Sequence, residues 1–114
     1  MSVKLTVREY LSADGRSYFR EWLDSLAVPV KARIQARILR FELGNLGDHK
    51  PVGGGVWEAR VMLGPGYRIY FGKDGRFIIL LLLGGDKSSQ RRDIRKARLL
   101  WREYLEATRH GTAD

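Results

Sequence analysis

The chain of 114 residues contains no cysteine, and this absence excludes several classes of protein. Without thiols there is no disulfide scaffold, no cysteine nucleophile and no cysteine-based zinc site. Histidine is also scarce, because only His49 and His110 are present and they are isolated from each other. Two isolated histidines do not supply the set of neighbouring ligands that a metal site needs. We therefore expect the protein to use neither a metal nor another cofactor.

Long apolar runs are missing as well. The longest is Phe77 to Leu83, whereas a membrane-spanning helix needs about 20 such residues. The opening residues, Met1 to Thr6, lack the apolar core of a signal peptide. We therefore expect a soluble, unexported protein of the cytoplasm that has no membrane partner.

Acidic residues are few compared with basic ones. The chain has 13 Asp and Glu against 21 Lys and Arg, a net charge of +8 and a pI near 10.2. The segment from Lys87 to Arg109 carries a net charge of +5 within that total. Such an uneven excess favours a polyanionic partner, with nucleic acid first and an acidic protein second. A basic surface that serves only solubility is the alternative.

The length and the hydrophobic fraction of 44% fit one folded domain over residues 1–114, with a frayed tail after about residue 108. Alternation of apolar and polar residues predicts a strand at Val3 to Arg8. Helical spacing predicts one helix over about 16–27, and a second that begins at Pro29 and ends at Gly44. The glycine-rich stretch from Gly44 to Gly55 is typical of a loop.

Three strands are predicted next, at Val56 to Leu63, Tyr67 to Lys73 and Arg76 to Leu83, followed by a helix over about 89–107. The third strand is apolar without alternation, which favours an interior position covered on both faces. The order β-α-α-β-β-β-α indicates an α+β domain. We expect an antiparallel sheet with its helices packed on one face and its other face partly open.

Strand alternation brings three cations together on that open face. Arg60 and Arg68 lie on neighbouring strands, and Lys87 emerges from the end of the third. Cations placed around a phosphodiester stabilise the extra negative charge of a pentacoordinate transition state. RNA supplies its own nucleophile in the neighbouring 2′-OH, so this chemistry requires no metal. Arg60, Arg68 and Lys87 are therefore the candidate catalytic residues.

Further residues are candidates for RNA binding because they add charge or a stacking surface. The arginines of the last helix recur at spacings of four, three and four, on one side of the helix. The candidates are Lys50, Tyr70, Arg91, Arg95, Arg98 and Arg102. The structural alternatives are an Arg60–Glu58 ion pair, a solvated Lys50 and arginine row, and tryptophans that belong to the core.

Two motifs carry a resemblance to a known family. Gly64-Pro65-Gly66-Tyr67-Arg68 follows Trp57-Glu58-Ala59-Arg60, and Gly84-Gly85-Asp86-Lys87-Ser88-Ser89-Gln90 follows the apolar strand. Together with Asp93, Ile94 and Ala97 they resemble the HigB-like "addiction module killer protein" group. That group belongs to the RelE/ParE toxin superfamily of type II toxin–antitoxin systems, and the likeness covers nearly the whole chain.

The resemblance implies a small RelE-like fold and a metal-independent, ribosome-dependent mRNA endonuclease that inhibits translation. It also implies a cognate antitoxin, often a helix-turn-helix protein, so that contact with DNA is only indirect. By position, Arg60 would bind the scissile phosphate and Arg68 would orient the backbone. Lys87 would stabilise charge on the phosphate or the leaving oxygen.

The sequence departs from several RelE-type nucleases, which carry a tyrosine near the site in the last helix or tail. Asp93 and Ile94 stand at the nearest positions here, and Tyr104 lies further along. The general base is left open among a lysine, Glu58 and the ribosome. Because fold alone does not give function, two alternatives remain. One is a ParE-like inhibitor of DNA gyrase, and the other is a non-catalytic nucleic-acid-binding relative.

Overall fold

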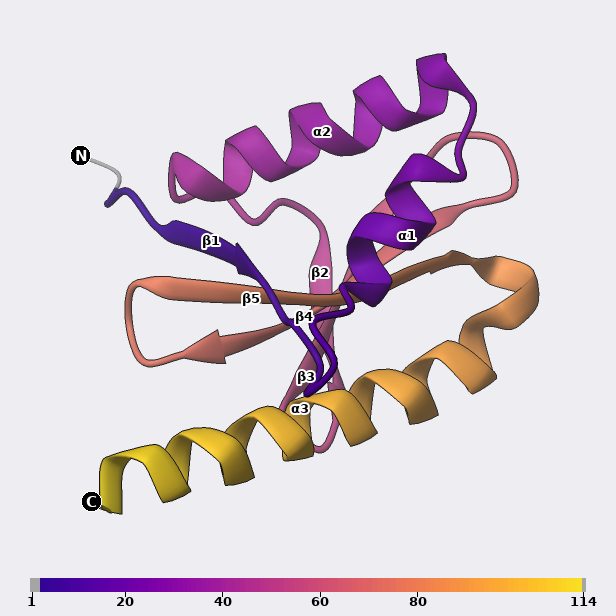
Figure 1. Cartoon of the computed structure of the whole chain (residues 1–114). Coiled ribbons are helices and arrows are strands. Elements are labelled where there is room, and N and C mark those ends of the chain that lie inside the picture. The colour runs from indigo at the N-terminus through magenta and orange to yellow at the C-terminus, as the bar shows by residue number, and fades with distance from the viewer. Residues whose placement is uncertain (1–2, 114) are drawn as a thin grey trace.

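The computed structural model describes residues 3–113, and the side chains of residues 3–109. It has a five-stranded sheet and three α-helices (Figure 1). The elements are β1 (Thr6–Glu9), α1 (Tyr18–Asp24), α2 (Val28–Glu42), β2 (His49–Gly53), β3 (Val56–Val61), β4 (Tyr67–Asp74), β5 (Ile78–Asp86), the 3-10 turn η1 (Lys87–Ser89) and α3 (Gln90–Ala113). This confirms an α+β fold.

The strands lie in the order β1-β5-β4-β3-β2, and the sheet is mixed. β1 runs parallel to β5, whereas all the other neighbours are antiparallel. The prediction of an antiparallel sheet is therefore wrong at β1. The interior position predicted for the apolar strand is confirmed, because β5 pairs with both β1 and β4.

β2 is an additional strand that the sequence pattern did not reveal. The predicted loop from Gly44 to Gly55 contains it, and it pairs with β3 through partners such as Lys50 and Glu58. It is an edge strand that carries Pro51, a residue that sheets accept at an edge. Because β2 lacks apolar alternation, its pairing with β3 defines it, and the order becomes β-α-α-β-β-β-β-α.

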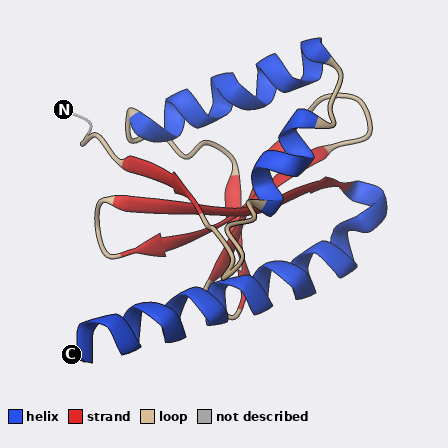
Figure 2. Cartoon of the chain, in the orientation of Figure 1, coloured by secondary structure: helices blue, strands red, loops and turns tan. Residues whose placement is uncertain are grey.

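The helices lie on both faces of the sheet, so the prediction that all pack on one face is wrong (Figures 1 and 2). Phe19 and Leu23 of α1 and Ile34 and Phe41 of α2 pack on one face, against side chains that include Ile79 and Leu81 of β5. On the other face, α3 supplies Ala97, Leu100 and Trp101, which pack with Val56, Tyr70, Leu80 and Leu82. α3 therefore covers the face that was expected to be partly open.

Two glycines explain how the helices approach the sheet so closely. A Cβ atom at Gly84 would overlap the Trp22 ring, and one at Gly72 would overlap the Trp101 ring. Large rings can lie flat on the strands only where the strand has no side chain. Trp22 and Trp101 therefore belong to the two cores, as the structural alternative held.

The last helix is longer than predicted, because α3 continues to Ala113 instead of ending near residue 107. The frayed tail was predicted to begin after about residue 108, whereas the backbone is helical to Ala113. Residue 114 and the side chains of residues 110–113 lie outside the described part of the chain.

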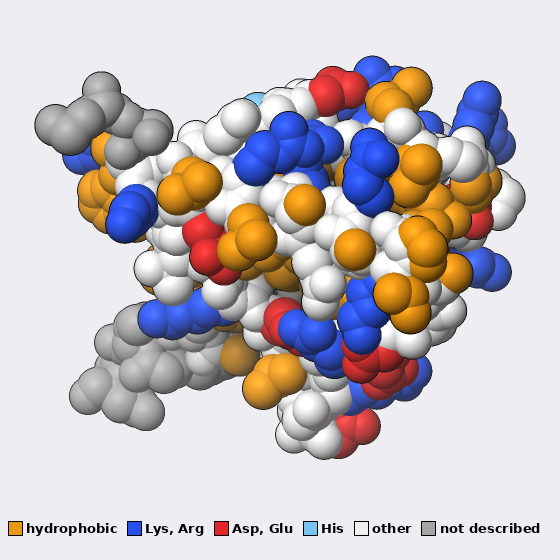
Figure 3. All heavy atoms as spheres, turned by 90° about the horizontal axis from the view of Figure 1, so that it is seen from above, with side chains coloured by type: hydrophobic (Ala, Val, Ile, Leu, Met, Phe, Trp, Pro, Cys, Tyr) orange, Lys and Arg blue, Asp and Glu red, His pale blue; other side chains and the backbone are white. Residues whose placement is uncertain are grey.

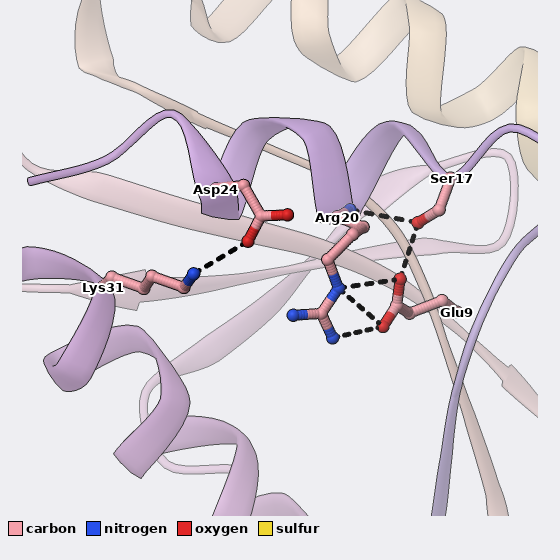
Figure 4. A network of polar contacts seen from close by, with 5 residues as sticks. All are labelled: Glu9, Ser17, Arg20, Asp24 and Lys31. Carbon is pink, nitrogen blue, oxygen red and sulfur yellow. Dashed lines mark hydrogen bonds and ion pairs between the residues drawn. The ribbon is translucent and has the colours of Figure 1, made fainter. Parts of the chain in front are cut away.

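A polar junction joins the end of β1 to the start of α1 (Figure 4). Arg20 donates hydrogen bonds from Nη2 and Nε to the Glu9 carboxylate, at 2.6 and 3.2 Å. The Ser17 hydroxyl also donates to Glu9 and accepts from the backbone N–H of Arg20, as an N-cap does. Partial burial raises the pKa of Glu9, but the hydrogen bonds from Arg20 and Ser17 outweigh this and lower it.

The junction predicts how stability responds to acid. Because the folded-state pKa of Glu9 is lowered, its stabilisation is present above its ordinary pKa of 4.5 and is lost as pH falls through the folded value. Glu9→Gln is therefore expected to flatten the fall in the free energy of unfolding below that pH. Urea titrations at a series of pH values measure this slope. Glu106→Gln, at an exposed position of α3, is the control and is expected to leave the slope unchanged.

Candidate active site

The three candidate catalytic cations line one pocket. Arg60 and Arg68 are direct cross-strand partners on β3 and β4. Lys87 follows Asp86, which is the partner of Tyr67 across β4 and β5. Arg60, Arg68 and Lys87 lie around a cavity of about 250 Å³, together with the turn between β3 and β4. The predicted proximity of the three cations is therefore observed, and their catalytic role stays a prediction.

The turn between β3 and β4 shapes one wall of this pocket. Gly64 and Gly66 have φ angles of +53° and +80°, which side chains disfavour. Arg68 Nη1 donates a 2.8 Å hydrogen bond back to the Gly66 carbonyl. A Cβ atom at Gly66 would lie 3.4 Å from that same nitrogen. Glycine at 66 is therefore required by the positive φ angle of the turn, since a Cβ atom there would reach Arg68 only at an ordinary contact distance.

Arg60 forms an ion pair with Asp48, in the loop before β2, and not with Glu58. Its Nε lies 3.3 Å from Asp48 Oδ2, and the two side chains are 41% and 55% exposed. The alternative of an Arg60–Glu58 pair is therefore wrong. An ion pair this exposed contributes about 0–1 kcal/mol. A phosphate can consequently replace the Asp48 carboxylate on Arg60 at little cost.

Arg37 of α2 holds the backbone around this ion pair. Its guanidinium donates to the carbonyls of Arg60 at 2.7 Å, Asp48 at 2.9 Å and Leu46 at 3.1 Å. Arg37 is only 6% exposed, and burial together with nearby Arg40 lowers its pKa. Arg37 was not among the residues predicted to belong to the site. Its position between Ile34 and Phe41, at helical spacings of three and four, was the available signal.

Tyr70 is wrong as a stacking residue, because its side chain is fully buried. It packs in the core beneath α3, on the face that was expected to be open. Burial, and then the neighbouring Glu58 carboxylate, raises the pKa of its hydroxyl well above the ordinary range. Tyr70 therefore offers no surface to an RNA base.

The arginines of α3 divide into two groups. Arg98 is held in the fold, since its Nε donates a 3.1 Å hydrogen bond to the Val52 carbonyl in β2. Arg98 remains exposed beside this bond, so its assignment to RNA binding stays a prediction. Arg91 and Arg95 are exposed, and with Lys87 they line a second hollow of about 630 Å³ at the start of α3. Lys87 borders both hollows, so the basic residues around them lie next to each other, and we call them together the basic surface.

The remaining candidates lie away from this surface. Lys50 is exposed on the edge strand β2, and Arg102 is exposed further along α3. Neither lines the pocket or the second hollow. Lys and Arg side chains also lie among hydrophobic ones on the face seen in Figure 3, which views the molecule from the side of α1 and α2. Positive charge is therefore not confined to the pocket, and long-range attraction of a polyanion does not by itself identify the pocket as the binding site.

Asp93 and Tyr104, which the family resemblance compares with a tyrosine near the site, also lie outside the pocket. The Tyr104 hydroxyl donates to Asp74, and burial followed by this hydrogen bond raises the pKa of Tyr104 to about 12. Asp93 is buried and accepts a hydrogen bond from Ser89. Tyr104 instead borders a separate hollow with Tyr10 and Glu103.

The part of the chain that the structure describes contains no cluster of three or more metal-ligating side chains. His49 bonds to the Gly47 carbonyl, and the His110 side chain is outside the described residues. Across residues 3–113, no helix has both the length and the apolar character needed to cross a bilayer.

Comparison with known proteins identifies a relative but no function. No family model matches the chain. An uncharacterized protein of Haemophilus influenzae is 45% identical over 86 residues, which cover 75% of this chain and 87% of that protein.

Proposed function

This chain belongs to one family with the uncharacterized protein of Haemophilus influenzae, and we propose that it is the toxin of a type II toxin–antitoxin module. We propose that it cuts mRNA on the ribosome as a metal-independent endoribonuclease of the RelE/ParE type. The observation that carries this proposal is the pocket that Arg60, Arg68 and Lys87 share. The first motif of the family resemblance, from Gly64 to Arg68, supplies much of the pocket's lining, and the second motif contributes Lys87.

The pocket suits in-line attack by the 2′-OH on the adjacent phosphorus. A new P–O2′ bond forms as the P–O5′ bond breaks, leaving a 2′,3′-cyclic phosphate and a 5′-OH. Arg60 neutralises a non-bridging oxygen, and its planar fork matches the phosphate geometry. Arg68 orients the same group, and Lys87 stabilises charge at the phosphate and the leaving 5′-oxygen.

Few groups can accept the proton that the attacking 2′-OH loses. No carboxylate or imidazole is among the residues that line the pocket. Glu58 has no exposed surface, so it cannot reach a 2′-OH. Lys87, the lysine that lines the pocket, keeps its proton to stabilise the leaving 5′-oxygen. The proton acceptor in this proposal is therefore a group of the ribosome, which fits an enzyme that works only on ribosome-bound mRNA.

The proposed setting is the cytoplasm, with a cognate antitoxin as the regulating partner. The antitoxin inhibits by covering the basic surface with acidic side chains, so the complex weakens as salt rises. Contact with DNA occurs only through the antitoxin, which the family resemblance indicates to be a helix-turn-helix protein.

Mapping the 5′ ends of a reporter mRNA in a cell-free translation system tests the proposal. With the protein added, we expect new ends inside the reading frame that are absent when ribosomes are withheld. The new 5′ ends are expected to carry a hydroxyl, so that they are ligated only after treatment with a polynucleotide kinase. An unchanged mRNA with translation undisturbed would overturn the proposal, and supercoiling by DNA gyrase would be assayed next.

A further inference from the structure

Glu58 on β3 is a buried carboxylate beside the pocket that the proposed mechanism does not use. Its side chain is 0% exposed, and its Oε2 lies 3.6 Å from Nε of Arg68, which is itself only 8% exposed. The same oxygen accepts a 2.9 Å hydrogen bond from Nε2 of Gln90, the first residue of α3. Glu58 therefore joins a pocket residue to the start of the helix that covers this face.

Stability alone does not explain this arrangement. Removing two charges from water costs several kcal/mol each, and an apolar pair of similar volume is often as stable. The ion pair is also incompletely satisfied, because Arg68 Nε has no hydrogen-bond partner and its 3.6 Å separation from Glu58 Oε2 is longer than a hydrogen bond. Buried polar atoms without partners are rare and call for a specific explanation.

The geometry explains why these buried polar groups are present, because two contacts constrain different edges of the Arg68 guanidinium. Nη1 is hydrogen-bonded to the Gly66 carbonyl, and the Nε edge faces Glu58. An arginine with neither contact would rotate among many rotamers and lose much side-chain entropy on binding a phosphate. With both contacts in place, Arg68 is oriented before any ligand enters the pocket.

We propose that Glu58 is a positioning residue that fixes the Arg68 guanidinium against the phosphate pocket, and that Gln90 holds Glu58 in place for this task. The inference rests on the proposed function, since it assigns Arg68 to the phosphate of an RNA substrate. It also removes Glu58 from the candidates for the general base. α3 thereby contributes to the site through Gln90 as well as through its exposed arginines.

Glu58→Gln tests the proposal, because it keeps the shape and a partner for Gln90 but removes the charge that faces Arg68. We expect cleavage of ribosome-bound mRNA to fall at least tenfold in kcat, with KM changed less than threefold. In an Arg68→Ala background, Glu58→Gln is expected to cause no further loss, because its effect acts through Arg68. Glu21→Gln, which breaks the exposed ion pair with Arg16, is the matched control and should cleave like the wild type.

A second measurement does not depend on cleavage. In ¹⁵N NMR spectra of the whole chain, the Arg68 Nε–H is expected to exchange slowly with water in the wild type and rapidly in Glu58→Gln. Gln90→Leu should have the same effect to a smaller extent, and it serves if Glu58→Gln does not fold.

Wild-type kcat in Glu58→Gln, or losses that multiply with those of Arg68→Ala, would show a role independent of Arg68 and overturn the inference. If the wild type does not cut mRNA, the proposed function fails separately. The NMR result then decides alone: unchanged exchange at Arg68 overturns the positioning role, and faster exchange supports it.

Discussion

Replacing Arg60 with alanine is expected to lower the rate of ribosome-dependent mRNA cleavage by at least a hundredfold. A single preorganised donor that meets developing charge in a transition state contributes about 10²–10³ in rate. Arg60 lines the pocket, and its only ion pair among the described residues is the exposed one with Asp48. The loss should therefore fall on catalysis, with the free energy of unfolding changed by about 0–1 kcal/mol.

Primer extension on the reporter mRNA at several toxin concentrations measures this rate. Arg33→Ala is the matched control, because it removes the same charge from an exposed position on α2. Equal losses in the two variants would mean that Arg60 acts only through long-range attraction. The pocket would then lose its assigned role in the chemistry.

Arg37→Met is expected to lower the free energy of unfolding by about 3–5 kcal/mol, a large part of the stability of a domain of this size. Methionine fills similar space but leaves the carbonyls of Arg60, Asp48 and Leu46 without their donor. Hydrogen bonds to a charged group contribute about 1.5–3 kcal/mol each. The change should therefore loosen the loop before β2 as well as destabilise the fold.

Urea unfolding followed by circular dichroism gives this free energy. Arg40→Met, at an exposed position one turn further along α2, is the control and should cost less than about 0.5 kcal/mol. A similar small cost in Arg37→Met would show that water or a neighbouring side chain satisfies the three carbonyls. The loop that carries Asp48 would then not depend on α2.

Local signals in the sequence were sufficient for most of the elements. Gly44 ends α2 with a positive φ angle, and Pro29 lies in the first turn of that helix, as their backbone preferences require. β5 reads as an interior strand because it is apolar at successive positions, and both of its faces are indeed covered. β2 was not predicted, because an edge strand needs no apolar alternation. Its hydrogen bonds to β3 define it instead.

The candidate site was predictable for those residues whose face of the sheet follows from the alternation of side chains along a strand. Cross-strand alternation brought Arg60 and Arg68 together, and the end of β5 delivered Lys87. The partners of these cations were not predictable, because they come from other elements. Asp48 reaches Arg60 from the loop before β2, and Gln90 reaches Glu58 from a position 32 residues away.

The basic character, the α+β class and the three cations at neighbouring strand ends followed from composition and strand period, which are local properties of the chain. The face of the sheet that α3 covers depends instead on packing in three dimensions. That packing buries Tyr70, lets Arg98 donate a hydrogen bond to the Val52 carbonyl, and places Gln90 against Glu58. Burial and pairing depend on contacts between segments far apart in the chain, and the same side chain is a surface ligand or a core residue according to the element packed upon it.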